Sequence, residues 1–98
     1  MSKNFEISTS RNVSGVRKLI SQYTMLVGNK KVGIKIYLGS DGYYQMDTSH
    51  YYRCKDCAGI YISSAANFSS EEEALNNAHQ QLTIFYDGEG EWRVNEDF

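Results

Sequence analysis

The sequence predicts a single α+β domain, spanning residues 1–98, in which an antiparallel sheet of four to five strands carries two helices packed on one face. The chain has 98 residues, which is enough for one hydrophobic core. Apolar residues make up 41% of it and charged residues 22%, as in globular domains. The apolar pattern switches between a period of two and a period near 3.6. This alternation predicts the order β-α-β-β-β-α-β.

The N-terminal part predicts a strand followed by a helix. Phe5 and Ile7 alternate with polar residues, which is typical of a strand. A helix is then expected from Asn12 to Val27, begun by a serine cap and ended at Gly28. Its apolar stripe follows the spacing i, i+3, i+4, i+7 and i+11: Val16, Leu19, Ile20, Tyr23 and Val27.

The middle of the chain predicts three strands. The clearest has apolar residues at every second position: Val32, Ile34, Ile36 and Leu38. The glycine-rich turn at 39–42 leads to a returning strand from Tyr43 to Asp47. A further strand is expected around Ala58, Ile60 and Ile62, after a connecting segment at 48–56.

The C-terminal part predicts a helix from Glu71 to Tyr86 and a last short strand. Ser70 and Glu73 have the spacing of a capping box, which begins a helix. The glycines at 88 and 90 end the helical pattern, and Trp92 and Val94 are then expected to face inward on a last short strand.

Charge is distributed unevenly along the chain. The formal charge is +6 from Met1 to Lys55 and −8 from Asp56 onward, although the total is only −2. Such asymmetry concerns partners and electrostatic steering rather than fold. The alternative is that the two sets interleave in space and cancel locally.

Eight tyrosines are more than one small core is expected to bury, and they indicate a protein-binding surface. Tyrosine supplies contact area, while exposed acids steer a partner that carries a basic nucleic-acid-binding groove. The predicted contact set contains Tyr43, Tyr44, Tyr51 and Tyr52 as anchors, with Glu71, Glu72, Glu89 and Glu91 as steering charges.

Four residues form a candidate metal site. His50, Cys54 and Cys57 have the spacing H-x3-C-x2-C, and His79 is a fourth candidate ligand. Structural zinc sites usually contain a second closely spaced pair, which the sequence lacks. We therefore expect no cofactor and free, structurally incidental thiols, since no signal peptide indicates an oxidising compartment. Zinc remains the alternative.

The sequence does not predict an enzyme. It contains no G-x-S-x-G motif and no Walker spacing, and Cys57 has no evident base near it in the sequence. Lys31, Lys35 and Tyr37 mix cations with an aromatic ring, as nucleic-acid platforms do, but the isoelectric point near 5.6 favours a protein partner. The longest apolar run, Met25 to Val27, is too short for a membrane span, so no membrane partner and a cytoplasmic location are expected.

The strand at Gly42-Tyr43-Tyr44 and the acidic helix start from Ser69 to Ala78 resemble those of small phage and mobile-element inhibitor proteins of the anti-CRISPR type. The resemblance implies a non-catalytic inhibitor that occupies a nucleic-acid-binding surface of a host effector complex. It assigns no residue roles, because such proteins share no common site. Two alternatives stay open: a zinc-stabilised module that binds nucleic acid or protein through the His50/Cys54/Cys57 region, and an accessory subunit of an enzyme complex.

Overall fold

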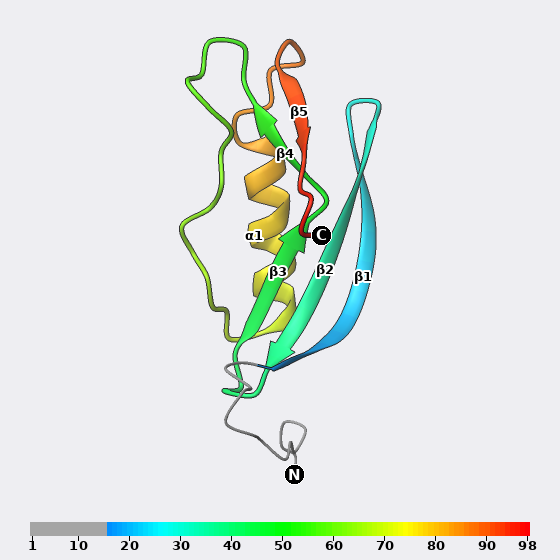
Figure 1. The fold of residues 1–98 in the computed structure, drawn as a ribbon, viewed down its shortest axis with the longest axis vertical. Coiled ribbons are helices and arrows are strands. Elements are labelled where there is room, and N and C mark those ends of the chain that lie inside the picture. Colours follow the sequence, from blue (N-terminus) through cyan, green and yellow to red (C-terminus); the bar gives the residue numbers. More distant parts are fainter. Residues whose placement is uncertain (1–15) are drawn as a thin grey trace.

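The computed structural model describes residues 16–98, and within them five strands form two antiparallel sheets beside one helix (Figure 1). The α+β class is therefore confirmed. The predicted strand at Phe5 and Ile7 lies outside the described residues. In chain order the elements are β1 (Arg17–Val27), β2 (Lys30–Gly39), β3 (Tyr44–Thr48), β4 (His50–Arg53), α1 (Glu71–Thr83) and β5 (Glu91–Val94).

The prediction of a helix ending at Val27 is wrong, because residues 17–27 form strand β1. This strand pairs with β2 along its length, with one register shift between Leu19 and Ser21. Gly28, expected to end a helix, instead forms the tight hairpin turn to β2 with a φ of 62°, which favours glycine. The backbone hydrogen bonds of β2 outweigh the helical spacing of the apolar residues in this segment.

The core lies between the first sheet, in the order β1-β2-β3, and α1. The predicted alternation of β2 is confirmed: Val32, Ile34 and Ile36 are 0% exposed. They form one cluster with Ala74, Ala78 and Leu82 of the helix, which are also 0% exposed. The small alanine side chains allow the helix to lie close to the sheet.

The predicted start of α1 is confirmed, and its predicted end is three residues too late. The Ser70 hydroxyl accepts a hydrogen bond from the Glu73 N–H at 3.1 Å, as in a capping box. The Glu73 carboxylate, however, accepts from the Ser69 N–H at 2.8 Å rather than from the cap's own amide. The helix ends at Thr83, so Phe85 and Tyr86 lie beyond it.

The second sheet consists of β4 and β5. Strand β5 confirms the predicted last strand, on which Trp92 is partly buried, but Val94 is 66% exposed and the prediction that it faces inward is wrong. Strand β4 lies in the segment expected to be a connection. The predicted strand at Ala58–Ile62 is wrong: this stretch is irregular, with the Tyr61 N–H bonded to the Tyr52 carbonyl at 3.1 Å. The exposure of Ile62 explains the error, because alternation predicts a strand only where one face is buried.

The expected arrangement of one sheet with two helices is thus replaced, among residues 16–98, by two sheets and one helix. Within this range no helix has the length and apolar character needed to cross a membrane.

Truncation of the core should test this packing. We expect Leu82→Ala to lower the free energy of unfolding by about 2–5 kcal/mol, because the side chain is fully buried between α1 and the sheet. Leu26→Ala is the matched control, since Leu26 is 66% exposed, and it should change the free energy by roughly 0.5 kcal/mol. Urea unfolding of both variants measures the difference, and equal losses would contradict the described core.

Candidate functional site

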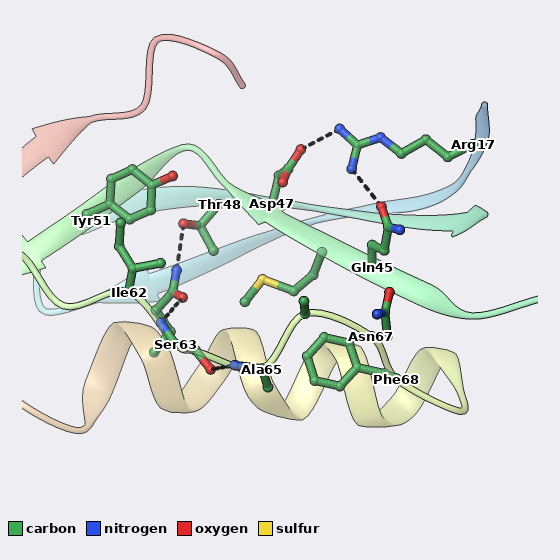
Figure 2. Close-up of a pocket in the computed structure, with 13 residues that line it drawn as sticks. Arg17, Gln45, Asp47, Thr48, Tyr51, Ile62, Ser63, Ala65, Asn67 and Phe68 are labelled. Atoms are coloured by element: carbon green, nitrogen blue, oxygen red, sulfur yellow. Dashed lines mark hydrogen bonds and ion pairs between the residues drawn. The ribbon is translucent and has the colours of Figure 1, made fainter. Parts of the chain in front are cut away.

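A groove of about 380 Å³ follows the outer edge of β3 (Figure 2). One wall is β3 and the other is the irregular segment at 62–68 that precedes α1. Arg17 lies at the mouth, and Gln81 of α1 lies in the floor. The groove is lined by Arg17, Gln45, Met46, Asp47, Thr48, Tyr51, Ile62, Ser63, Ala65, Ala66, Asn67, Phe68 and Gln81.

A backbone bridge closes one end of the groove. The Tyr44 N–H donates to the Phe68 carbonyl at 2.8 Å, and the Phe68 N–H donates to the Tyr44 carbonyl at 2.9 Å. This bridge is isolated, so the chain N-terminal to Phe68 does not continue as a strand beside β3. The space between the two walls forms the groove.

Gln81 fixes the floor by hydrogen bonds at both ends of its carboxamide. Its Nε2 donates to the Thr48 hydroxyl at 3.2 Å, and its Oε1 accepts from the Ser63 N–H at 2.8 Å (Figure 2). Gln81 is 4% exposed and Thr48 is 1% exposed. Because a buried amide without partners is costly, these two bonds hold the 62–68 segment at a set position relative to β3.

Arg17 is oriented at the mouth by three contacts. Its guanidinium lies over the Tyr37 ring, 3.8 Å from the ring centroid. It donates to Gln45 Oε1 at 3.2 Å and to Asp47 Oδ2 at 3.1 Å (Figure 2). Such a partly exposed pair adds little stability, but it leaves a cation and a carboxylate side by side at the groove entrance.

Tyr51 supplies a protonated hydroxyl to the same groove. Burial raises the pKa of its phenol, and the charges of Asp47 and Asp97 raise it further. The hydroxyl therefore remains a hydrogen-bond donor at neutral pH.

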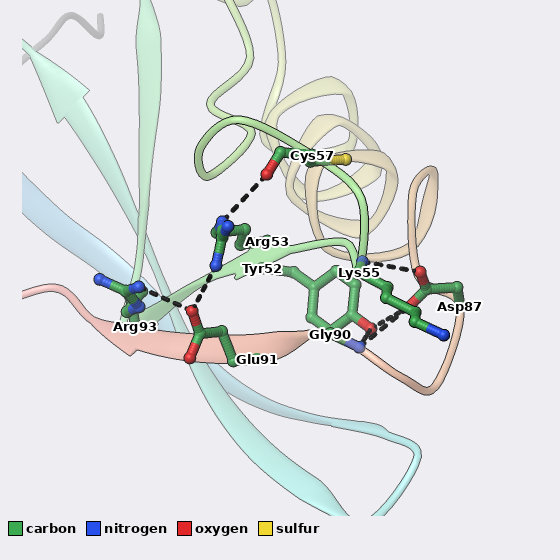
Figure 3. Close-up of polar contacts among 8 residues, drawn as sticks. All are labelled: Tyr52, Arg53, Lys55, Cys57, Asp87, Gly90, Glu91 and Arg93. Atoms are coloured by element: carbon green, nitrogen blue, oxygen red, sulfur yellow. Dashed lines mark hydrogen bonds and ion pairs between the residues drawn. The ribbon is translucent and has the colours of Figure 1, made fainter.

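A second polar cluster lies beyond β4, around Asp87 (Figure 3). The Asp87 carboxylate accepts hydrogen bonds from the Tyr52 hydroxyl and from the Lys55 N–H, the latter at 2.9 Å. It also accepts from the amides of Glu89 at 3.0 Å and Gly90 at 3.1 Å. These donors, first of all the Lys55 amide, hold the pKa of Asp87 far below its ordinary value of 3.8. The cluster fixes the turn into β5 and the turn after β4.

The two cysteines do not have the free thiols that we expected, because Cys54 and Cys57 form a disulfide with their Cα atoms 5.2 Å apart. The structure also does not bring them together with the two histidines, since residues 16–98 contain no cluster of three or more potential metal ligands. His50 contacts the Ser49 hydroxyl at 2.7 Å, and His79 lines a separate hollow between β1 and α1.

The four predicted tyrosine anchors have different environments. Tyr52 is 3% exposed and packs against the rings of Tyr86 and Trp92, with centroids 5.0 and 4.8 Å away. Tyr44 is partly buried against the core, and Tyr51 is partly buried in the groove. Tyr43 is 51% exposed and therefore has the most accessible ring of the four.

The predicted acidic residues do not form one patch. Glu71 accepts from the hydroxyls of Ser21 at 2.6 Å and Tyr23 at 2.9 Å, which lower its pKa. Glu72 is exposed beside it at the start of α1. The turn before β5 and β5 itself carry Glu89 and Glu91, at the other end of the helix (Figure 1).

Two of these acids form ion pairs on that distant side. Glu89 pairs with Lys55 at 3.3 Å. Glu91 lies 2.7 Å from both Arg93 and Arg53, and their hydrogen bonds lower its pKa (Figure 3). Three of the four predicted steering acids thus hold intramolecular contacts.

Sequence reasoning missed most of the groove. Gln45 and Asp47 are two residues apart on a predicted strand, so the sequence does indicate that their side chains lie on the same face of the sheet. The predicted helix from Asn12 to Val27 contains Arg17, and a helix there does not indicate the contact between Arg17 and Asp47. Gln81 lies 33 residues from its partner Thr48, and nothing local in the sequence indicates that contact.

Comparison with known proteins gives no relative: no family model, no curated protein and no solved structure matches the chain. We therefore base the function on the geometry of the groove.

The Asp87 cluster generates a pH-dependent prediction. As the pH falls below about 4, the unfolded chain binds a proton at Asp87 before the folded chain does, so the stabilisation is complete above the ordinary pKa and is lost below it. Asp87→Asn should therefore be less stable than the unsubstituted protein at pH 7, and this difference should shrink from about pH 5 to pH 2. Chemical unfolding across this range measures it.

Asp56→Asn serves as the control, because Asp56 is exposed and no hydrogen bond among the described residues uses its carboxylate. A difference for Asp87→Asn that stays constant from pH 7 to pH 2 would contradict the role given to the carboxylate.

The cysteine pairing is tested by alkylation and metal analysis of protein purified without reductant or chelator. We expect no alkylation of the unfolded chain before reduction, alkylation of both cysteines after it, and no stoichiometric zinc. Two reactive thiols accompanied by one zinc per chain would instead support the zinc-stabilised alternative.

Proposed function

We propose that the protein is a non-catalytic binding protein whose groove along β3 receives part of a partner protein. The observation that carries this proposal is the fixed geometry of the groove. Its floor is held by Gln81 and its mouth by Arg17, before any partner binds. Fixed side chains lower the entropy cost of binding.

The charges of the groove favour a polypeptide over a nucleic acid. Arg17 is paired with Asp47, so the entrance carries both signs and has little net attraction for phosphate. On the same face of the sheet, the Lys35 ammonium is bonded to the Phe98 carbonyl at 2.6 Å and lies over the Phe98 ring. These cations already have partners, whereas no hydrogen bond among residues 16–98 uses the Asn67 carboxamide or the Tyr51 hydroxyl, which line the groove and suit a polar polypeptide segment.

The hydroxyl groups of the groove support a binding role rather than a catalytic one. Thr48 donates its proton to the His50 carbonyl at 2.9 Å, and a carbonyl cannot act as a general base. The Ser63 hydroxyl accepts from the Ala65 amide at 3.2 Å, which favours a structural role in the turn. Neither hydroxyl has the activated environment of a nucleophile.

A narrower proposal is that the partner is a host nucleic-acid-handling complex and that the protein inhibits it in the cytoplasm. Its support is the anti-CRISPR resemblance, the tyrosine content and the exposed ring of Tyr43. The acidic steering set supports it less, because Glu71, Glu89 and Glu91 contact groups of their own chain. The groove is therefore the better supported contact surface.

Selection of binders from a random twelve-residue peptide library tests the groove directly. Ala66→Arg places a long side chain in the groove, and Ala58→Arg is the matched control at an exposed position between β4 and α1 that lies outside the groove. We expect peptides selected on the unsubstituted protein to lose at least about tenfold in affinity for Ala66→Arg, or about 1.4 kcal/mol, and to retain affinity for Ala58→Arg.

Isothermal titration calorimetry measures these affinities, and circular dichroism checks that both variants fold. A library that gives no binder, or only binders insensitive to Ala66→Arg, would contradict binding in the groove.

A further inference from the structure

We infer that the occupant of the groove is an extended segment of the partner protein that pairs with β3 as an added strand. This inference rests on the proposed function and specifies how the groove binds. Strand addition is a common mode of peptide recognition, in which backbone hydrogen bonds give affinity and alternate side chains give specificity.

The first step is the direction of the backbone groups of β3. The Ser49 N–H donates to the Gly33 carbonyl at 2.9 Å, and the Gly39 N–H donates to the Tyr43 carbonyl at 2.9 Å. Residues 43 and 49 therefore bond toward β2. Tyr44, between them, exchanges both of its backbone bonds with Phe68 on the opposite side. The direction of the backbone N–H and carbonyl groups alternates along a strand, so these groups of the even-numbered residues of β3 point away from β2.

The second step identifies the open positions. The N–H and carbonyl of Met46 point into the groove by this alternation. The N–H of Thr48 has the same direction, but Thr48 is 1% exposed, so this N–H is not accessible to an added strand. The Thr48 carbonyl is used, since it accepts from Asn95 Nδ2 at 2.9 Å. No backbone group among residues 16–98 forms a cross-strand bond to the outward side of Met46. Among the described residues, one donor and one acceptor, both on Met46, thus remain along the β3 wall, and one residue of an added strand can bond to both.

The third step is the shape of the space beside these groups. The Tyr44–Phe68 bridge shows that the chain can pair with this edge of β3. Beyond the bridge, the opposite wall is held away by Gln81, which links Thr48 to Ser63 (Figure 2). An added strand would enter where Phe68 leaves the edge and pair opposite Met46. The paired stretch is therefore short.

The fourth step predicts the sequence of the added segment. Met46 and Thr48 are paired with Ile36 and Ile34, so they share the face of the sheet that packs on α1. Gln45 and Asp47 share the opposite face, where Arg17 lies. Side chains of an added strand alternate in the same way. We therefore expect apolar residues on the Met46 side and polar residues on the Arg17 side.

Amide hydrogen exchange measured by NMR tests the pairing, with the peptides selected above as probes. We expect the Met46 amide to exchange freely in the unbound protein and at least about tenfold more slowly with saturating peptide. The Ser49 amide is the internal control, because it is already bonded to Gly33 and should change little. Methylation of single backbone nitrogens of the peptide should weaken binding only at every second position, because only every second N–H group faces β3.

Three results would overturn this inference. Groove-bound peptides that leave Met46 exchange unchanged would show side-chain recognition only, and the proposed binding function would still stand. A Met46 amide already protected in the free monomer would place another part of this chain at the edge. Protection that depends on protein concentration would identify a second copy as the occupant. The absence of any peptide sensitive to Ala66→Arg is a separate failure, which contradicts the binding function itself.

Discussion

The packing of β2 on α1 is the constraint on which the rest of the structure depends. Val32, Ile34 and Ile36 of β2 are fully buried in one cluster with Ala74, Ala78 and Leu82 of α1. Alanines at the contact bring the helix close, so that Gln81, one residue before Leu82, reaches Thr48 at 3.2 Å. A larger residue at position 78 would push the helix away and break this bond, because well-packed cores do not absorb added volume freely. The packing of the hydrophobic core therefore determines the geometry of the groove.

The buried carboxamide of Gln81 makes the position of the groove wall depend strongly on the position of the helix. A polar group of this kind costs about 1–3 kcal/mol when it loses a partner, and Gln81 has partners on two separate segments. Movement of the 62–68 segment away from β3 would leave one of them unpaired. The irregular wall of the groove is thus held by Gln81 of the helix and by the backbone bridge at Phe68, although the segment itself contains no regular structure. This explains how a loop forms a stable binding wall.

The sequence predicts the parts of the fold that bury one face and alternate cleanly, and it fails elsewhere for physical reasons. Strand β2 and the start of α1 have unambiguous local signals in their alternation and their capping serine. Strand β1 is an edge strand of its sheet, and Leu26 is exposed on it, so its apolar residues do not alternate strictly and fit a helical period as well. Strand β4 is only four residues long and is recognisable through its pairing with β5. Local sequence patterns do not predict the groove, because Arg17 and Gln45 are 28 residues apart and come into contact only when β1 pairs as a strand.

An open strand edge carries a risk of aggregation, and the surroundings of β3 limit that risk while leaving room for one segment. Natural proteins protect such edges by keeping them short, charged or covered. Strand β3 has five residues, and the Phe68 bridge and the Asn95 side chain occupy its backbone at either end. The paired charges of Arg17 and Asp47 stand at the entrance, and the 62–68 wall faces the edge across the groove. This wall would collide with a flat sheet edge from another molecule, whereas a single extended segment fits between the wall and β3. The features that expose Met46 to a partner therefore also restrict the partner to a narrow, extended shape.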